Sequence, residues 1–184
     1  MNIANRLSVI RITLVPVFVG SLLYYASAPA LFRALSLGTF TLACVTDGVD
    51  GYLARRLHQH TVLGSYIDPI ADKLLLTSGF LSLSLMSHLP VSMQIPGWVT
   101  ITVIARDVII MIGSAMIFVT TGTLKAQPLF IGKITTVTQM ITLMASLLSA
   151  PLTIQLPLYL ATVALTILSG VWYIRVGGQI IQSS

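Results

Sequence analysis

Long apolar stretches alternate with short polar breaks along the whole chain. The apolar stretches cover residues 8–25, 30–53, 67–87, 97–119, 131–150 and 154–175. Each is close to the roughly 20 residues that a helix needs to cross about 30 Å of hydrocarbon. The breaks are rich in proline, glycine and charged residues, which are typical of loops. The pattern therefore predicts an all-α integral membrane protein with six transmembrane helices.

The composition supports this interpretation and excludes an ordinary soluble domain. Hydrophobic residues make up 55% of the 184 residues, charged residues only 8%, and the mean hydropathy is +0.94. Soluble domains contain about 25% charged residues. Six spans use the whole length, so we expect a single membrane domain over residues 1–184. The single cysteine, Cys44, excludes a disulfide framework and a cysteine-based metal site.

The basic residues are unevenly distributed among the predicted loops. With six spans, both termini and the loops around residues 55–64 and 122–128 lie on one side. The opposite loops carry only Arg33. The first side carries Arg6, Arg11, Arg55, Arg56, Lys125, Lys133 and Arg175. The positive-inside rule therefore predicts cytoplasmic termini, and the compact chain without a targeting extension favours a bacterial inner membrane.

The chain begins with a short amphipathic segment, residues 2–8, ahead of the first apolar stretch. One interpretation is an N-terminal interfacial segment that lies along the cytoplasmic surface. The other is an ordinary positively charged flank of the first helix.

The negative charge is concentrated in one part of the sequence. The chain has no glutamate, and four of its five aspartates lie between Asp47 and Asp72. Asp47 and Asp50 are three residues apart, and Asp68 and Asp72 are four apart, so each pair shares a helix face. A loop of about ten residues makes the two helices antiparallel neighbours. Four carboxylates are therefore expected to converge at one depth near the cytoplasmic side.

Grouped carboxylates repel one another and are costly within a membrane. Divalent cations relieve that cost, and oxygen ligands select hard ions such as Mg²⁺, Mn²⁺ or Ca²⁺. Four carboxylates are enough for two ions, an arrangement suited to phosphoryl chemistry. The alternative is a set of neutral or salt-bridged carboxylates that supports the helix bundle, with Arg55, Lys73 and Arg106 as partners.

The aspartates belong to a longer motif. The order Asp-Gly-x₂-Ala-Arg-x₈-Gly-x₃-Asp-x₃-Asp runs without a gap from Asp50 to Asp72, with Asp47 three residues before it. This motif resembles the signature of the CDP-alcohol phosphatidyltransferase family. The spacing of Asn5 and Arg11, the stretch 104–107 and the pair 132–133 are also similar to family features, so the resemblance covers most of the chain.

The resemblance implies an integral membrane enzyme, commonly homodimeric, that transfers a phosphatidyl group from CDP-diacylglycerol to an alcohol and releases CMP. It implies two divalent ions, Mg²⁺ or Mn²⁺, held by Asp47, Asp50, Asp68 and Asp72, with Asp72 as the general base. It also implies a CDP-diacylglycerol site bordered by Asn5, Thr46, Gly51, Ala54, Arg55 and Gly64. The expected partners are these substrates and membrane lipid, with no nucleic acid.

Two cations outside the signature suggest an anion pocket for an acceptor phosphate. Arg106 lies well inside the fourth apolar stretch, where an unpaired cation is disfavoured, and Lys133 opens the fifth. Alternatively, Arg106 forms a salt bridge with Asp107 or with a site aspartate, and Lys133 is an ordinary positive flank.

Among the branches of the family, the sequence most resembles the one that uses sn-glycerol 3-phosphate. It departs from that branch at Asp107, Ser114 and Thr135, where the branch usually carries glutamate, arginine and lysine. Because fewer cations weaken the case for a doubly charged acceptor, phosphatidylglycerol is the alternative. A divalent-cation transporter is a more distant alternative, but it lacks the inverted repeats typical of transporters and would not release CMP.

Overall fold

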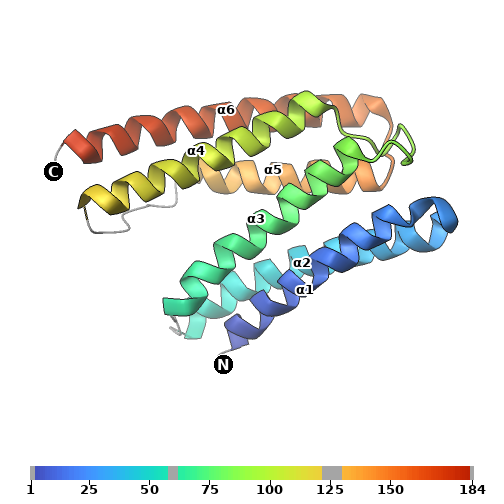
Figure 1. Ribbon diagram of the computed structural model, residues 1–184, viewed down its shortest axis with the longest axis horizontal. Coiled ribbons are helices and arrows are strands. Elements are labelled where there is room, and N and C mark those ends of the chain that lie inside the picture. Colours follow the sequence, from blue (N-terminus) through green and yellow to red (C-terminus); the bar gives the residue numbers. More distant parts are fainter. Residues whose placement is uncertain (1–2, 58–61, 122–129, 183–184) are drawn as a thin grey trace. The chain divides into compact units, whose positions relative to one another are not determined.

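The computed structural model describes residues 3–57, 62–121 and 130–182, and the side chains of residues 10–48, 73–116, 119, 130–176 and 178. The described residues form helices and contain no strand, which confirms the all-α prediction. The elements are α1 (Ile3–Leu23), the 3₁₀ helix η1 (Tyr25–Ser27), α2 (Pro29–Leu57), α3 (Val62–Leu85), α4 (Gly97–Thr121), α5 (Phe130–Leu147) and α6 (Leu152–Gln182) (Figure 1).

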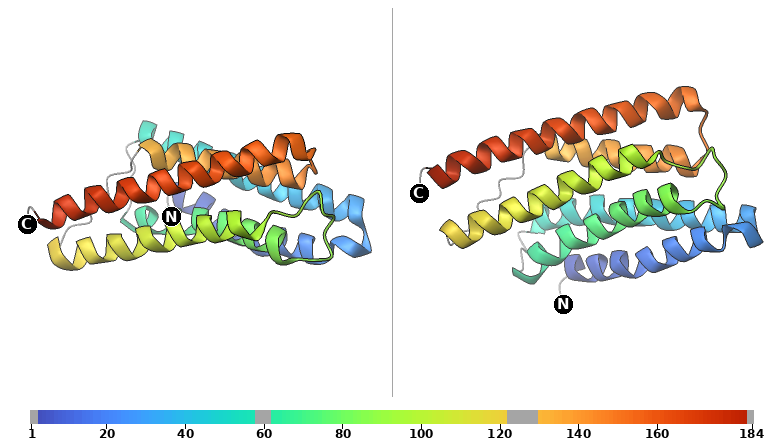
Figure 2. Two further views of the ribbon diagram at one scale, coloured as in Figure 1. Left: turned by 90° about the horizontal axis from the view of Figure 1, so that it is seen from above. Right: turned by 45° about the horizontal axis from the view of Figure 1, so that its top comes forward.

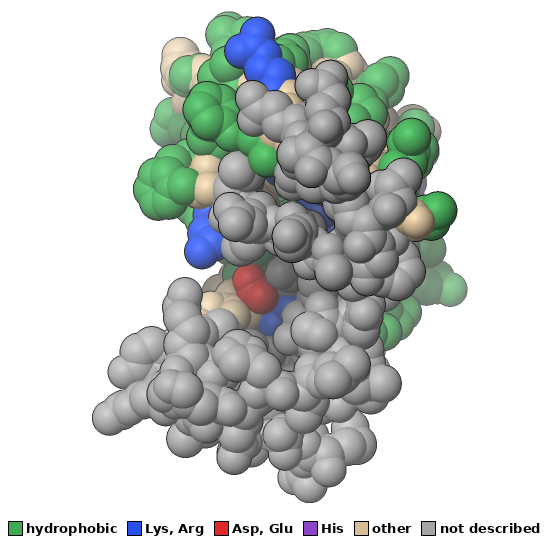
Figure 3. All heavy atoms as spheres, turned by 90° about the vertical axis from the view of Figure 1, so that its left-hand side faces the viewer, with side chains coloured by type: hydrophobic (Ala, Val, Ile, Leu, Met, Phe, Trp, Pro, Cys, Tyr) green, Lys and Arg blue, Asp and Glu red, His purple; other side chains and the backbone are tan. Residues whose placement is uncertain are grey.

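Within the described ranges, four helical stretches are long and apolar enough to cross a membrane: Pro29–Gly48, Gly97–Met116, Phe130–Leu147 and Leu152–Val176. Two shorter apolar stretches, Ile10–Leu23 and Lys73–Leu85, belong to α1 and α3. Many of the apolar side chains on these helices are exposed in the isolated chain. Figure 3 shows hydrophobic side chains over much of the described part of one face, with lysine and arginine side chains among them. This is the surface expected of helices that lie in hydrocarbon.

Several helices extend beyond the predicted apolar stretches. Helix α1 begins at Ile3, so the amphipathic start is continuous with the first apolar helix. Helix α2 runs to Leu57 and includes the first part of the signature, and α6 runs to Gln182. The helical hydrogen bonds propagate along the backbone whatever the side chain, so a helix does not stop where hydrophobicity stops.

Pro157 lies inside a helix, within the sixth predicted apolar stretch. Helix α6 begins at Leu152, so its proline falls in the second turn. Proline removes one backbone donor, and this is tolerated best near a helix start, where few intrahelical bonds are lost. Pro29 illustrates the same rule, since it is the first residue of α2.

The chain forms two compact units, and the first comprises Met1–Ile95 and Leu143–Ala150. Helix α1 packs against both α2 and α3 in this unit (Figures 1 and 2). Phe18 and Phe40 are fully buried with ring centroids 5.7 Å apart. A Cβ atom at Gly79 would lie 3.1 Å from Leu143 Cδ1, so glycine lets the end of α5 approach α3 closely.

The C-terminus of α5 belongs to this first unit and is fully capped. Ser149 has a φ of 50° and its N–H donates to Ser146 O, while Ala150 N–H donates to Ala145 O, both at 2.9 Å. This pattern is a Schellman motif. The guanidinium of Arg33 on α2 donates to the carbonyls of Leu147, at 3.1 Å from Nε, and Leu148. The carbonyls at this helix end are therefore satisfied by backbone and by one cation.

The second unit comprises Pro96–Thr142 and Pro151–Ser184, and in it α4 lies beside α6 (Figure 2). Helix α5 faces α6 through a buried polar stripe. Thr142 and Thr162 hydroxyls are 2.7 Å apart, and Gln139 Nε2 donates to Thr166 Oγ1 at 3.4 Å. Hydrogen bonds between membrane helices contribute about 0.6 kcal/mol each on average. The stripe therefore sets the register of α5 on α6 more than it adds stability.

Candidate functional site

The signature aspartates lie on two consecutive helices of the first unit. Asp47 and Asp50 belong to α2, and Asp68 and Asp72 belong to α3. The predicted helical spacing of each pair is therefore present in the backbone. The side chains of Asp50, Asp68 and Asp72 lie outside the described residues, so their predicted convergence stays a prediction.

Asp47 is held by an arginine from the first helix. Arg11 Nη1 lies 3.2 Å from Asp47 Oδ1, and the Arg11 side chain is 1% exposed while that of Asp47 is 33% exposed. This partnership was not predicted, because Arg11 was expected only as a positive flank and a family feature. The available signal was its place between Ile10 and Ile12, inside an apolar stretch.

The residues at this place fit a hard divalent cation. All four predicted ligands carry carboxylate oxygens, which Mg²⁺ and Mn²⁺ prefer. The Asp47 carboxylate is partly exposed, so an ion can reach it. Among the described side chains there is no cluster of three or more potential ligands, because three of the four aspartates lie outside that set.

The predicted CDP-diacylglycerol residues are also in the first unit. Thr46 is on α2, and its hydroxyl donates within the helix to Leu42 O or Ala43 O, at 2.9 and 2.8 Å. Its oxygen lone pairs stay available as acceptors. The backbones of the remaining predicted residues are helical, but their side chains lie outside the described residues: Asn5, Gly51, Ala54, Arg55 and Gly64.

Arg106 has a specific set of neighbours in the second unit. Its Nη1 donates to Asp107 Oδ1 at 2.9 Å, and its Nη2 donates to Ser169 Oγ on α6 at 2.6 Å. The arginine is 8% exposed and Asp107 is 6% exposed. The structure therefore contains the ion pair with Asp107 that was the alternative expectation for Arg106.

Two glycines make room for the Arg106 side chain. A Cβ atom at Gly132 on α5 would lie 3.4 Å from Arg106 Nη2, and one at Gly170 on α6 would lie 3.6 Å from Arg106 Cγ. Lys133, the other predicted acceptor residue, is the next residue after Gly132 and is exposed. The guanidinium thus lies against the turn of α5 that carries Lys133.

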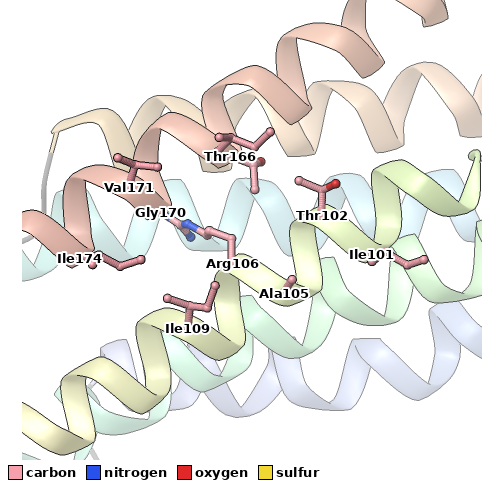
Figure 4. A pocket seen from close by; sticks show the side chains of 10 residues that line it. Ile101, Thr102, Ala105, Arg106, Ile109, Thr166, Gly170, Val171 and Ile174 are labelled. Carbon is pink, nitrogen blue, oxygen red and sulfur yellow. The ribbon is translucent and has the colours of Figure 1, made fainter.

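An apolar cavity of about 330 Å³ opens between α4 and α6 beside this arginine. In Figure 4 the Arg106 side chain extends from α4 toward Gly170, with Ala105 and Ile109 on α4 and Val171 on α6 around the opening. The volume is at the small end of the range of about 300–1,000 Å³ typical of ligand pockets.

At two positions where the family branch usually carries a cation, this chain has a hydroxyl side chain that makes contacts between helices. Ser114 Oγ on α4 lies 2.5 Å from the phenol oxygen of Tyr173 on α6. Thr135 is fully buried, and its hydroxyl is within hydrogen-bond distance of Ile131 O at 2.8 Å and Leu165 O at 3.2 Å. These two positions are therefore part of the helix packing in this chain.

Comparison with known proteins agrees with the signature. The sequence model of the CDP-alcohol phosphatidyltransferase family matches residues 1–172. The chain belongs to this family of enzymes, which confirms the resemblance drawn from the motif and favours an enzyme over a cation transporter.

Individual relatives carry more specific names. A probable phosphatidylglycerophosphate synthase of Mycobacterium tuberculosis is 32% identical over 176 residues, covering 94% of this chain and 80% of the relative. The CDP-diacylglycerol–glycerol-3-phosphate 3-phosphatidyltransferase of Bacillus subtilis is 32% identical over 160 residues, covering 80% of this chain and 77% of the relative. A human cardiolipin synthase (CMP-forming) is 34% identical over 168 residues, covering 82% of this chain and 51% of the relative.

Proposed function

We propose that this protein transfers the phosphatidyl group of CDP-diacylglycerol to sn-glycerol 3-phosphate and releases CMP. The observation that carries the proposal is the complete family signature on α2 and α3, within a family match that runs over residues 1–172. The names of the Mycobacterium tuberculosis and Bacillus subtilis relatives support glycerol 3-phosphate as the acceptor.

Asp47, Asp50, Asp68 and Asp72 are the residues that would hold two divalent cations, Mg²⁺ or Mn²⁺. When bound, such ions supply positive charge to the pyrophosphate of CDP-diacylglycerol and to the charge that develops on departing CMP. The donor chemistry of this set and the partial exposure of Asp47 support the assignment.

The reaction is an in-line displacement at the phosphatidyl phosphorus. The acceptor oxygen forms a bond to that phosphorus, and the bond from the phosphorus to the bridging oxygen of CMP breaks. Asp72 accepts the proton of the acceptor hydroxyl, which requires a carboxylate within hydrogen-bond reach. CMP leaves with the bridging oxygen and its electron pair.

Small residues beside the aspartates give the nucleotide access to α2. A Cβ atom at Gly48, next to Asp47, would meet no atom of the described residues within 4 Å. Gly51 and Ala54 follow at a spacing of three residues on the same helix. Together with Asn5, Thr46, Arg55 and Gly64, they are the proposed CDP-diacylglycerol residues.

Arg106 and Lys133 are the proposed residues for the acceptor phosphate. Arg106 is already paired with Asp107, so its net contribution to anion binding is smaller than that of an unpaired arginine. The neutral contacts at Ser114 and Thr135 further reduce the number of cations. These observations, with the human cardiolipin synthase relative, favour phosphatidylglycerol as the second candidate acceptor.

The proposed membrane arrangement has six spans, with both termini and the metal site at the cytoplasmic face of a bacterial inner membrane. The amphipathic start, residues 2–8, would lie along that interface, and from Ile3 onward it forms the first turns of α1. The two units would act as a single domain in a homodimer. The family match across both units supports a single domain, and the apolar stretches on all six helices support the spans. The distribution of basic residues among the loops supports the cytoplasmic side.

The test is CMP release by purified protein with CDP-diacylglycerol and Mg²⁺ or Mn²⁺, with glycerol 3-phosphate and phosphatidylglycerol supplied in separate reactions. We expect release with glycerol 3-phosphate and its loss when EDTA removes the metal. Release only with phosphatidylglycerol would identify the second candidate as correct. Absence of release with either acceptor, from folded protein containing metal, would contradict the proposal.

A further inference from the structure

The ion pair between Arg11 and Asp47 joins a buried cation to a partly exposed carboxylate. Arg11 lies on α1 within an apolar stretch and is 1% exposed. A buried arginine in a membrane helix is costly unless it is paired. The contact runs from Arg11 Nη1 to Asp47 Oδ1 at 3.2 Å. This placement means that α1, which carries no predicted metal ligand, nevertheless reaches the first aspartate of the signature.

The contact with Arg11 is made by one of the two oxygens of the Asp47 carboxylate. Oδ1 is the atom that faces Arg11, while 33% of the Asp47 side chain is exposed and open to an approaching ligand. A carboxylate fixed through one oxygen cannot rotate freely about its last bond. Its second oxygen is therefore presented in a narrower range of directions than that of an unsupported aspartate.

We propose that Arg11 is a positioning residue for the metal site, which orients Asp47 so that its second oxygen is presented to a divalent cation. This inference rests on the proposed function, in which Asp47 is a metal ligand. Hydrogen-bond partners behind a metal ligand typically change metal affinity by about 10–100-fold when they are removed.

Positioning and simple charge repulsion predict opposite results. A guanidinium near a metal site repels a cation, so its removal by charge alone would tighten metal binding. If Arg11 acts by orienting Asp47, its removal weakens binding despite the loss of that repulsion. The sign of the change in affinity therefore distinguishes the two roles.

The experiment measures Mn²⁺ binding to purified protein in detergent without either substrate, by the electron paramagnetic resonance signal of free Mn²⁺. We expect Arg11→Gln to weaken binding by about 10–100-fold. Arg11→Lys keeps the charge but lacks the planar fork, so its affinity is expected between that of Arg11→Gln and the native protein. If Arg11→Gln does not fold, Arg11→Lys decides: weaker binding supports the inference, and native affinity overturns it.

The matched control is Arg33→Gln, because Arg33 lies in the same unit and donates only to the Leu147 and Leu148 carbonyls in its described contacts. This variant is expected to bind Mn²⁺ with native affinity. In an Asp47→Asn background, Arg11→Gln should cause no further loss of affinity, because the favourable effect of Arg11 acts through Asp47. A further loss in that background would indicate a general structural role and overturn the inference.

The outcomes separate this inference from the proposed function. Native Mn²⁺ binding by Asp47→Asn would contradict the proposal that Asp47 is a metal ligand. It would also overturn the proposal that Arg11 positions Asp47 for the metal. Weakened binding by Asp47→Asn together with native or tighter binding by Arg11→Gln would overturn the positioning role alone.

Discussion

The hydroxyl of Ser114 on α4 lies 2.5 Å from the phenol oxygen of Tyr173 on α6. In the family branch that this sequence most resembles, an arginine is usual at the position of Ser114. Here the position is occupied by a neutral pair that ties two helices of the second unit together. The proposed binding of an acceptor phosphate therefore depends on Arg106 and Lys133 without a further arginine at this point.

Gly113→Ala should destabilise the protein because its methyl group meets Tyr173. A Cβ atom at Gly113 would lie 2.9 Å from Tyr173 Cε1, closer than Cβ atoms approach ring carbons, so the ring must shift. Overpacking of this kind costs about 1–3 kcal/mol. Thermal unfolding in detergent should show a lower midpoint temperature.

The control for this variant is Gly38→Ala. A Cβ atom at Gly38 on α2 would meet no described atom within 4 Å. Replacement of glycine by alanine within a helix is then favourable by up to about 1 kcal/mol. The two variants should shift the unfolding temperature in opposite directions, and a rise for both would contradict the close contact at Tyr173.

Asp107→Asn should destabilise the second unit more than Ser169→Ala does. Both residues bond to Arg106, but Asp107 alone balances its charge, and both members of the ion pair are less than 10% exposed. Removal of one partner of a buried pair costs about 3–5 kcal/mol, whereas a hydrogen bond between membrane helices contributes about 0.6 kcal/mol on average. Equal losses of unfolding free energy would show that the ion pair contributes little.

Lys133→Ala should raise the KM for the acceptor more than the KM for CDP-diacylglycerol. The exposed ammonium group is proposed to bind the acceptor phosphate, and a hydrogen bond to a charged group contributes about 1.5–3 kcal/mol, or about 10- to 150-fold in affinity. Steady-state kinetics with each substrate varied in turn gives the two constants. Arg175→Ala, which removes an exposed cation from α6, is the control and should change neither constant. Equal increases for both substrates would indicate a structural role for Lys133.

Asp50→Asn should lower the rate of CMP release by at least about 100-fold while the protein stays folded. The change keeps the size of the side chain but removes the charge that is proposed to bind a metal ion, and loss of one electrostatic contact to a transition state costs about 10²–10³-fold in kcat. Membrane insertion and thermal unfolding should remain close to those of the native protein. Near-native turnover of this variant would rule out a metal-binding role for Asp50.

The helices were largely predictable because hydrophobicity and loop residues act locally. The fourth apolar stretch was predicted to begin at residue 97, and α4 begins at Gly97 after the proline-rich segment. The ends of α1, α2 and α6 were not predicted, because helical hydrogen bonding continues through polar residues once a helix has formed. Pro157 lies in the second turn of α6, and a proline this close to a helix start need not end the helix.

The candidate site was predictable where its residues are neighbours in the sequence. The spacing of Asp47 and Asp50 needs only a helix to become a shared face. The pairing of Arg11 with Asp47 depends instead on how α1 packs on α2, and no local pattern encodes that contact. Similarly, the sequence was compatible with either Asp107 or a signature aspartate as the partner of Arg106. The pairing with Asp107 depends on the conformation of the Arg106 side chain, which lies beside Gly132 and Gly170.

The cap on α5 also has a consequence for the order of assembly. Arg33 and its first acceptor, the Leu147 carbonyl, are 114 residues apart, so α2 is synthesised long before its arginine has this partner. Until α5 emerges, the guanidinium must be satisfied by water or lipid head groups. The first unit therefore completes its hydrogen bonding late in biosynthesis, when residues 143–150 dock onto helices that were made much earlier.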